Sequence, residues 1–124
     1  MRHHKVIVVD SEPAICQMLG DAFDSAGFQG HFAASGEDAI SALKDDPIGF
    51  AVALIDAHLP GLNAIDTASS LRAINPNIAI AFMAASGDAI TTFGAKLYLK
   101  PFRSTTRLLA SLQELLDAYD ADNP

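Results

Sequence analysis

The stretch FAVALIDAHLPGLNA (residues 50–64) contains an apolar run that ends in one carboxylate, Asp56, before Pro60 and Gly61 mark a loop. A continuous apolar run of this length is typical of a strand buried on both faces of a sheet. An acidic side chain that ends such a strand lies at the edge of the sheet and not on a solvent-exposed face. We therefore expect a buried central strand that presents Asp56 at the rim of the fold.

The alternation of strand and helix continues along the whole chain. Five segments have the apolar or β-branched composition of strands: 5–9, 28–34, 50–55, 78–83 and 96–99. Helical spacing of apolar residues follows the first three and the last, with Ser35 and Asn63 as candidate N-caps and Gly27 as a candidate helix end. Such alternation predicts an α/β fold, a doubly wound five-stranded parallel sheet of flavodoxin-like order 2-1-3-4-5.

Three charged residues end strands of this predicted sheet. Asp10 follows the first strand, Asp56 ends the third, and Lys100 follows the fifth. Ligands of doubly wound sheets bind outside the carboxyl ends of the strands, where the strand order reverses, which here is between the first and third strands. We therefore expect these three side chains to meet in one site.

Composition limits the function classes. The chain has 124 residues and a net charge of −7, and it has neither a long apolar run nor a basic footprint. We expect one domain over residues 1–124, cytoplasmic, with no membrane span and no direct contact with nucleic acid. The lone Cys16 excludes an intramolecular disulfide. His3, His4 and His31 lack metal-ligand spacing and are expected to be exposed.

Three motifs carry a resemblance to a known family. VIVVDSEP (6–13), LIDAHLPGL (54–62) and GAKLYLKPF (94–102) together resemble the receiver domain of two-component response regulators. The resemblance implies that Asp56 accepts a phosphoryl group from a histidine kinase or phosphotransfer protein, and that the domain then signals through protein contacts. It also implies a signalling domain and no ordinary enzyme, one that catalyses at most its own phosphoryl transfer and autodephosphorylation. Neither the cognate kinase nor the downstream partner can be read from the sequence.

The resemblance also implies a magnesium site. Acids after the first strand, Asp56 and the backbone carbonyl of His58 would hold Mg²⁺, and Lys100 would contact the phosphoryl oxygens. A divalent cation suits the chemistry, since it offsets the negative charge that a carboxylate and a phosphoryl group bring together. The His58 imidazole is interpreted as a bystander.

Two site positions depart from the family pattern. The family has two adjacent acids after the first strand, but here the second is Ser11, so Mg²⁺ is expected to bind weakly. Glu12 either reaches inward as a substitute ligand or stays in solvent. The fourth strand usually ends in Thr or Ser, but that position is Ala84 here, and Ser86 is the candidate that would supply the hydroxyl.

A third departure concerns the fourth helix. The interval between the fourth and fifth strands is too short for an ordinary helix and its loops. We expect this helix to be truncated or replaced by a loop, so the surface that reads out phosphorylation in the family must be built differently. We expect no output domain within residues 1–124.

Two other functions stay open. A pseudo-receiver would keep the fold as a protein-binding module without phosphoryl chemistry, and Ser11 and Ala84 favour it, whereas Asp56 and Lys100 oppose it. A flavin-binding protein of flavodoxin type would share the topology. Its phosphate loop would be rich in hydroxyl groups and glycine, whereas the loop here is the acidic DSEPA (10–14).

Overall fold

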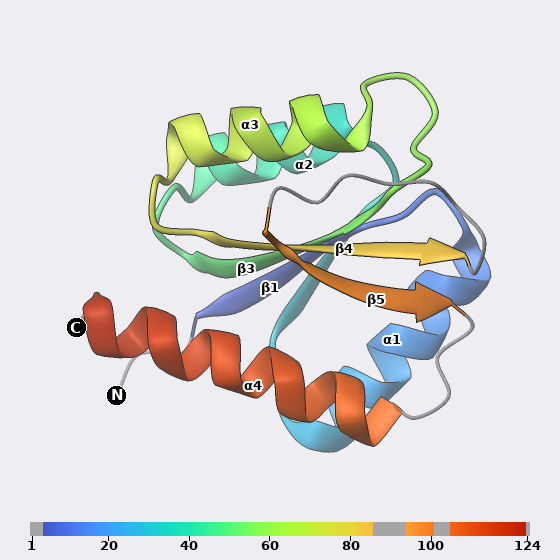
Figure 1. The fold of residues 1–124 in the computed structure, drawn as a ribbon, viewed down its shortest axis with the longest axis vertical. Helices are drawn as coiled ribbons and strands as arrows, with labels where there is room; N and C mark the ends of the chain where they lie inside the picture. The colour runs from blue at the N-terminus through green and yellow to red at the C-terminus, as the bar shows by residue number, and fades with distance from the viewer. Residues whose placement is uncertain (1–3, 86–93, 101–104, 124) are drawn as a thin grey trace.

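The computed structural model describes residues 4–85, 94–100 and 105–123. The strands and helices follow one another as β1 (Lys5–Val9), α1 (Pro13–Ala26), β2 (Gly30–Ala33), α2 (Gly36–Asp45), β3 (Phe50–Asp56), α3 (Ala64–Ile74), β4 (Ala79–Ala85), β5 (Lys96–Lys100) and α4 (Thr105–Asp122). The five strands form one parallel sheet in the order β2-β1-β3-β4-β5 (Figure 1). The predicted fold class and strand order are confirmed.

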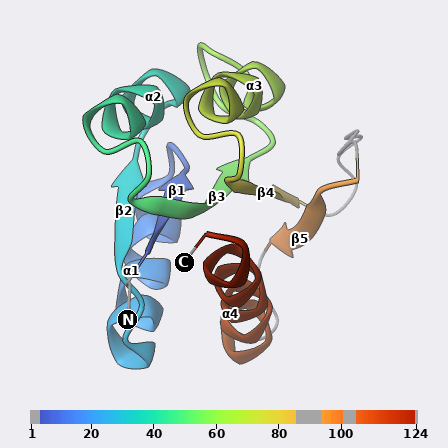
Figure 2. The ribbon, with the colours of Figure 1, turned by 90° about the vertical axis from the view of Figure 1, so that its left-hand side faces the viewer.

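Helices cover both faces of the sheet. Figure 2 shows α2 and α3 on one face and α1 and α4 on the other. Each layer has its own apolar core, one formed by the sheet with α1 and α4, and one by the sheet with α2 and α3. The central strand β3 is buried along its whole length, as its apolar sequence predicts. Burial on both faces holds the carboxyl end of β3, and with it Asp56, in a fixed position.

The predicted helix ends are confirmed. The Ser35 hydroxyl accepts a hydrogen bond from the Asp38 backbone N–H at 3.1 Å, and the Asn63 side chain accepts one from the Asp66 N–H at 2.8 Å. Gly27 follows α1 in the left-handed conformation with φ of 77°, which a glycine adopts without strain. These local signals set the helix boundaries from the sequence itself.

The connection between β4 and β5 is short. It consists of residues 86–95, of which 86–93 lie outside the described part of the chain. The described residues contain four helices, consistent with the predicted truncation of the helix between these strands. None of the described helices is both long enough and apolar enough to span a membrane.

The expected exposure of His4 is wrong. Its side chain is only 6% exposed, because the last turns of α4 cover the start of β1. The His4 ring makes an edge contact with Tyr119 and its Nδ1 bonds the Asp120 carboxylate. His31 is exposed as expected, and His3 lies outside the described residues.

Candidate functional site

Three strands deliver the charged residues of the site to one edge of the sheet. Asp10 follows β1, Asp56 ends β3 and Lys100 ends β5. The Lys100 ammonium lies 2.9 Å from Asp10 Oδ2 and 3.4 Å from Asp56 Oδ1. The structure therefore brings these three strand-end residues together, as the sequence predicts.

Burial makes these contacts strong. The Asp10 side chain is fully buried, and the side chains of Asp56 and Lys100 are 7% and 10% exposed. Burial alone would lower the pKa of Lys100, but the hydrogen bond that its ammonium donates to Asp10 and the charges of Asp10, Asp56 and Glu12 outweigh burial and raise that pKa. Lys100 is therefore a fixed positive charge at neutral pH.

Glu12 joins the site from the start of α1. Its backbone N–H donates to Asp10 Oδ1 at 2.9 Å, which fixes the loop after β1. Its Oε1 lies 3.5 Å from the Lys100 ammonium, although the Glu12 side chain is 62% exposed. The side chain thus points toward the site and keeps room to move. Ser11 is exposed beside it.

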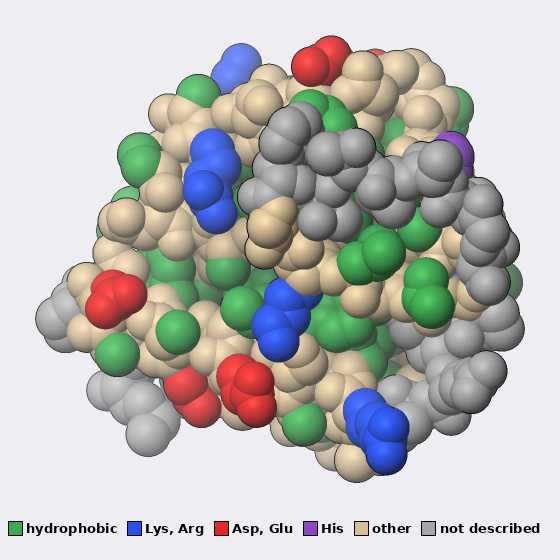
Figure 3. All heavy atoms as spheres, viewed as in Figure 1, with side chains coloured by type: hydrophobic (Ala, Val, Ile, Leu, Met, Phe, Trp, Pro, Cys, Tyr) green, Lys and Arg blue, Asp and Glu red, His purple; other side chains and the backbone are tan. Residues whose placement is uncertain are grey.

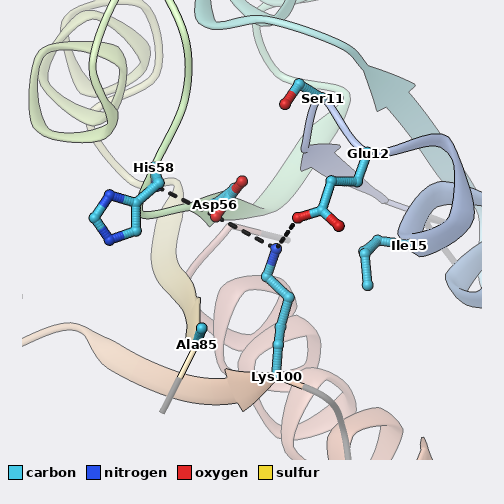
Figure 4. A pocket seen from close by; sticks show the side chains of 7 residues that line it. All are labelled: Ser11, Glu12, Ile15, Asp56, His58, Ala85 and Lys100. Carbon is cyan, nitrogen blue, oxygen red and sulfur yellow. Dashed lines mark hydrogen bonds and ion pairs between the residues drawn. The ribbon is translucent and has the colours of Figure 1, made fainter. Parts of the chain in front are cut away.

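A cavity of about 370 Å³ opens onto this cluster. Figure 4 shows the side chains of Asp56, Glu12 and Lys100 converging there, with the Lys100 ammonium between the two carboxylates. Asp56 Oδ1 also accepts the His58 backbone N–H at 3.3 Å, and the other Asp56 oxygen points away from both partners (Figure 4). The His58 ring is exposed and points away from Lys100.

The acids are arranged as a cation site would require. Asp10, Glu12 and Asp56 each offer a carboxylate oxygen, and these oxygens lie within 4.8 Å of one another. Carboxylate oxygens are the ligands that Mg²⁺ prefers. The Lys100 ammonium lies among the same carboxylates, so this location already attracts positive charge. The residues therefore fit a divalent cation.

The last two residues of β4 are both alanines. Ala84 is buried and pairs with Leu99, whereas Ala85 pairs with Lys100 and lines the cavity. Ala85 therefore lines the cavity at the end of β4, and neither alanine carries a hydroxyl group. Ser86 lies outside the described residues.

Sequence reasoning missed two side chains near the site. Ile15 in the first turn of α1 is half-buried and lines the cavity. The Cys16 thiol donates to the Asp10 backbone carbonyl at 3.4 Å, and burial together with the Asp10 charge raises its pKa. Helical periodicity could not reveal either role, since it identifies the apolar face of a helix and not what the residues on that face contact.

Comparison with known proteins assigns this chain to a family. The profile of the response regulator receiver domain family matches residues 6–113. The chain therefore belongs to the response regulator receiver domains, the signalling domains of two-component systems. The resemblance drawn from the three sequence motifs is confirmed.

Particular relatives agree with this assignment. The sporulation initiation phosphotransferase F of Bacillus subtilis (strain 168) is 29% identical over 89 residues, which are 71% of this chain and 69% of the relative. The chain spans about half the length of two further curated relatives, 45% of one and 49% of the other.

Solved structures share the fold. A receiver domain protein from Clostridium thermocellum has a TM-score of 0.85 at 19% identity, with 95% of this chain and 98% of that chain covered. A chain of the Saccharomyces cerevisiae co-crystal of the histidine phosphotransfer protein Ypd1 with the Ssk1 receiver domain has a TM-score of 0.78 at 18% identity, with 92% and 89% covered.

Proposed function

We propose that this domain works in the cytoplasm as a phosphoacceptor, and that it takes a phosphoryl group from a histidine kinase or phosphotransfer protein onto Asp56. The observation that carries the proposal is the Asp56 carboxylate itself. It is held at the end of a buried strand, 3.4 Å from the Lys100 ammonium, and it opens onto a cavity. Residues 1–124 act as one receiver domain that signals through protein contacts.

The acceptor atom follows from the hydrogen bonds. Oδ1 of Asp56 is held by the His58 N–H and by Lys100, while the second oxygen points away from them. We assign the second oxygen, Oδ2, as the nucleophile. It forms a P–O bond as the P–N bond of the donor phosphohistidine breaks, and the imidazole nitrogen leaves with the bonding electron pair. The acyl phosphate on Asp56 is later hydrolysed within the same site.

Lys100 and the acids have different electrostatic roles in the proposed site. The Lys100 ammonium is a fixed charge that binds the phosphoryl oxygens. Asp10, Glu12, Asp56 and the His58 carbonyl would hold Mg²⁺, which when bound offsets the negative charge of the acids and phosphoryl group. Ser86, beyond the described residues, is the proposed source of the hydroxyl that Ala85 lacks.

Support for the phosphotransfer partner comes from the relatives. One relative is named a phosphotransferase, and one structural neighbour is a receiver crystallised with a histidine phosphotransfer protein. The present chain has the same fold and an open cavity at the carboxyl edge of the sheet, where a partner's histidine could approach Asp56.

The second candidate is a pseudo-receiver that binds proteins without phosphoryl chemistry. Two observations favour it: Ser11 stands where the family has an acid, and the β4 residue that lines the cavity is Ala85. The buried contact of Lys100 with Asp10 and Asp56 favours the phosphoacceptor, since a binding module has no need for it.

Intact-mass measurement after treatment with acetyl phosphate and Mg²⁺ separates the two. The phosphoacceptor gives a single phosphoryl adduct that Asp56→Asn abolishes. As a matched control, Asp66→Asn, at an exposed acid in the first turn of α3, leaves the adduct unchanged. If no adduct forms under any metal or donor concentration, the pseudo-receiver is the better account.

A further inference from the structure

The Ser11 hydroxyl belongs to the cavity that gathers polar groups around Asp56. On the face of the molecule seen in Figure 3, by contrast, acidic and basic side chains are scattered over the surface. Figure 4 shows Ser11 on the opposite side of the Asp56 carboxylate from Lys100, which is the side toward which Oδ2 of Asp56 points. Because Oδ2 is the proposed nucleophile, a phosphoryl group on Asp56 would extend toward Ser11.

The loop after β1 fixes the position of this hydroxyl. Oδ1 of Asp10 accepts a hydrogen bond from the Glu12 backbone N–H at 2.9 Å, and Ser11 is the residue between them. A turn closed in this way by an Asp side chain restrains the backbone of its middle residue. The other Asp10 oxygen lies 2.9 Å from the Lys100 ammonium. Ser11 is therefore anchored to the buried part of the site, although its own side chain is exposed.

The hydroxyl has no structural role among the residues that the structure describes. A serine just before a helix often caps it by accepting a hydrogen bond from the first turn. The N-cap of α1 is instead Glu12, whose side chain makes no capping hydrogen bond. Within the described part of the chain, the Ser11 hydroxyl makes no hydrogen bond to another residue. Its O–H group is therefore available to a ligand in the cavity.

A phosphoryl group needs several hydrogen-bond donors, because each of its terminal oxygens is a strong acceptor. Lys100 supplies a cationic donor, but its ammonium already contacts three carboxylates. Ala85, which lines the cavity at the end of β4, supplies no donor from its side chain. A hydroxyl on the Ser11 side of the cavity therefore provides a contact that neither of these side chains provides.

We propose that the Ser11 hydroxyl donates a hydrogen bond to an oxygen of the phosphoryl group on Asp56. Ser11 stands where the family pattern has an acid, so this chain has a phosphoryl-binding hydroxyl at a position that otherwise binds metal. The hydroxyl keeps its proton while the P–O bond to Asp56 forms and the bond to the donor's leaving group breaks. Donors already in place stabilise the charge that phosphoryl transfer develops. The inference rests on the proposed role of Asp56 as the phosphoacceptor.

Beryllofluoride binding tests this contact. Beryllofluoride stands in for the phosphoryl group on Asp56, and its fluorines accept hydrogen bonds in place of the phosphoryl oxygens. Fluorine NMR at saturating Mg²⁺ measures its affinity. Ser11→Ala is expected to weaken binding by about tenfold, and Ser11→Thr, which keeps a hydroxyl, to stay within about twofold of wild type. Ser25→Ala is the matched control and is expected to change nothing, because Ser25 is exposed at the far end of α1.

Two further measurements separate the phosphoryl contact from a metal contact. Titration with Mg²⁺ alone is expected to give equal affinities for wild type and Ser11→Ala, because the hydroxyl contacts the phosphoryl group and not the metal. Intact mass after addition of acetyl phosphate and Mg²⁺ is expected to show that Ser11→Ala forms the Asp56 adduct about tenfold more slowly than wild type, as acetate leaves with the electron pair of the broken P–O bond.

Several outcomes would overturn the inference. These are equal beryllofluoride affinity in wild type and Ser11→Ala, a loss in Ser11→Thr as large as in Ser11→Ala, or a loss of Mg²⁺ affinity in Ser11→Ala that accounts for its loss of beryllofluoride. A wild-type domain that forms neither the beryllofluoride complex nor the adduct refutes the proposed function, and the inference with it. A wild-type domain that forms both, and that Ser11→Ala matches, refutes the inference alone.

Discussion

At the scale of single residues, the site is organised around the Lys100 ammonium. It contacts Asp10, Glu12 and Asp56 at 2.9, 3.5 and 3.4 Å, so it offsets the repulsion of three carboxylates in a largely buried place. Ser11 removes one negative charge from this cluster compared with the family pattern. The charge balance of the site therefore depends on these few side chains.

Ser11→Asp is expected to tighten Mg²⁺ binding. The new carboxylate adds negative charge and a hard oxygen beside the site, and Ser11 already lines the cavity. Titration of amide shifts with Mg²⁺ measures the affinity, and Ser11→Asn controls for side-chain size without charge. If Ser11→Asp changes nothing while Glu12→Gln abolishes binding, Glu12 has already replaced the missing acid.

Lys100→Gln is expected to lower the free energy of unfolding at pH 7 by about 1–3 kcal/mol, because Asp10 loses a charged hydrogen-bond donor while buried. The pKa of Lys100 is raised in the folded state, so its contribution is complete below the ordinary lysine pKa of about 10.4 and is lost as pH rises through the raised value.

Urea unfolding at a series of pH values from neutral to strongly alkaline measures this difference. The gap between wild type and Lys100→Gln should stay constant to about pH 10 and narrow above it. Lys96→Gln, at an exposed lysine of the same strand, should change little at any pH. A gap that closes below pH 8 would contradict the assignment.

At the scale of elements, the close approach of α2 and α3 constrains the loop that follows Asp56. A Cβ built on Gly36 would lie 2.1 Å from the Thr67 hydroxyl, so the first turn of α2 tolerates no side chain there. Gly20 in α1 is different, since its nearest neighbours are 3.8 Å away in the Phe32 ring. Steric contact therefore excludes a side chain at Gly36 but not at Gly20.

Gly36→Ala is expected to destabilise the domain by about 1–3 kcal/mol through overpacking, and Gly20→Ala to stabilise it by about 0.5–1 kcal/mol through helix propensity. Thermal and urea unfolding measure both. Thr67→Ala should restore part of the stability lost in Gly36→Ala, as neighbouring sites are not additive. Equal effects of the two glycine variants would refute the close approach.

The elements were predictable because their signals are local. The apolar run of β3, the caps Ser35 and Asn63, and Gly27 each act within a few residues. The burial of His4 depends on Asp120, which is 116 positions away, and no local pattern contains that contact. Ala85 lines the cavity and Ala84 does not because of strand register, where a shift of one residue reverses the face of the sheet.

At the scale of the whole molecule, the fold gathers its charged site at one edge. The carboxylate and lysine cluster lies at the carboxyl edge of the sheet, where β1, β3 and β5 each contribute one charged residue. The helices that cover both faces of the sheet leave this edge open to the cavity.

The site of phosphorylation tests the central claim most directly. After treatment with acetyl phosphate and Mg²⁺, borohydride reduction of an aspartyl phosphate gives homoserine, and peptide sequencing by mass spectrometry locates it. The account predicts homoserine at Asp56, with none at Asp10 or Asp66 and none in Asp56→Asn. Homoserine at another position, or its absence from a folded domain that has been incubated with donor and metal, would contradict the assignment of Asp56 as the phosphoacceptor.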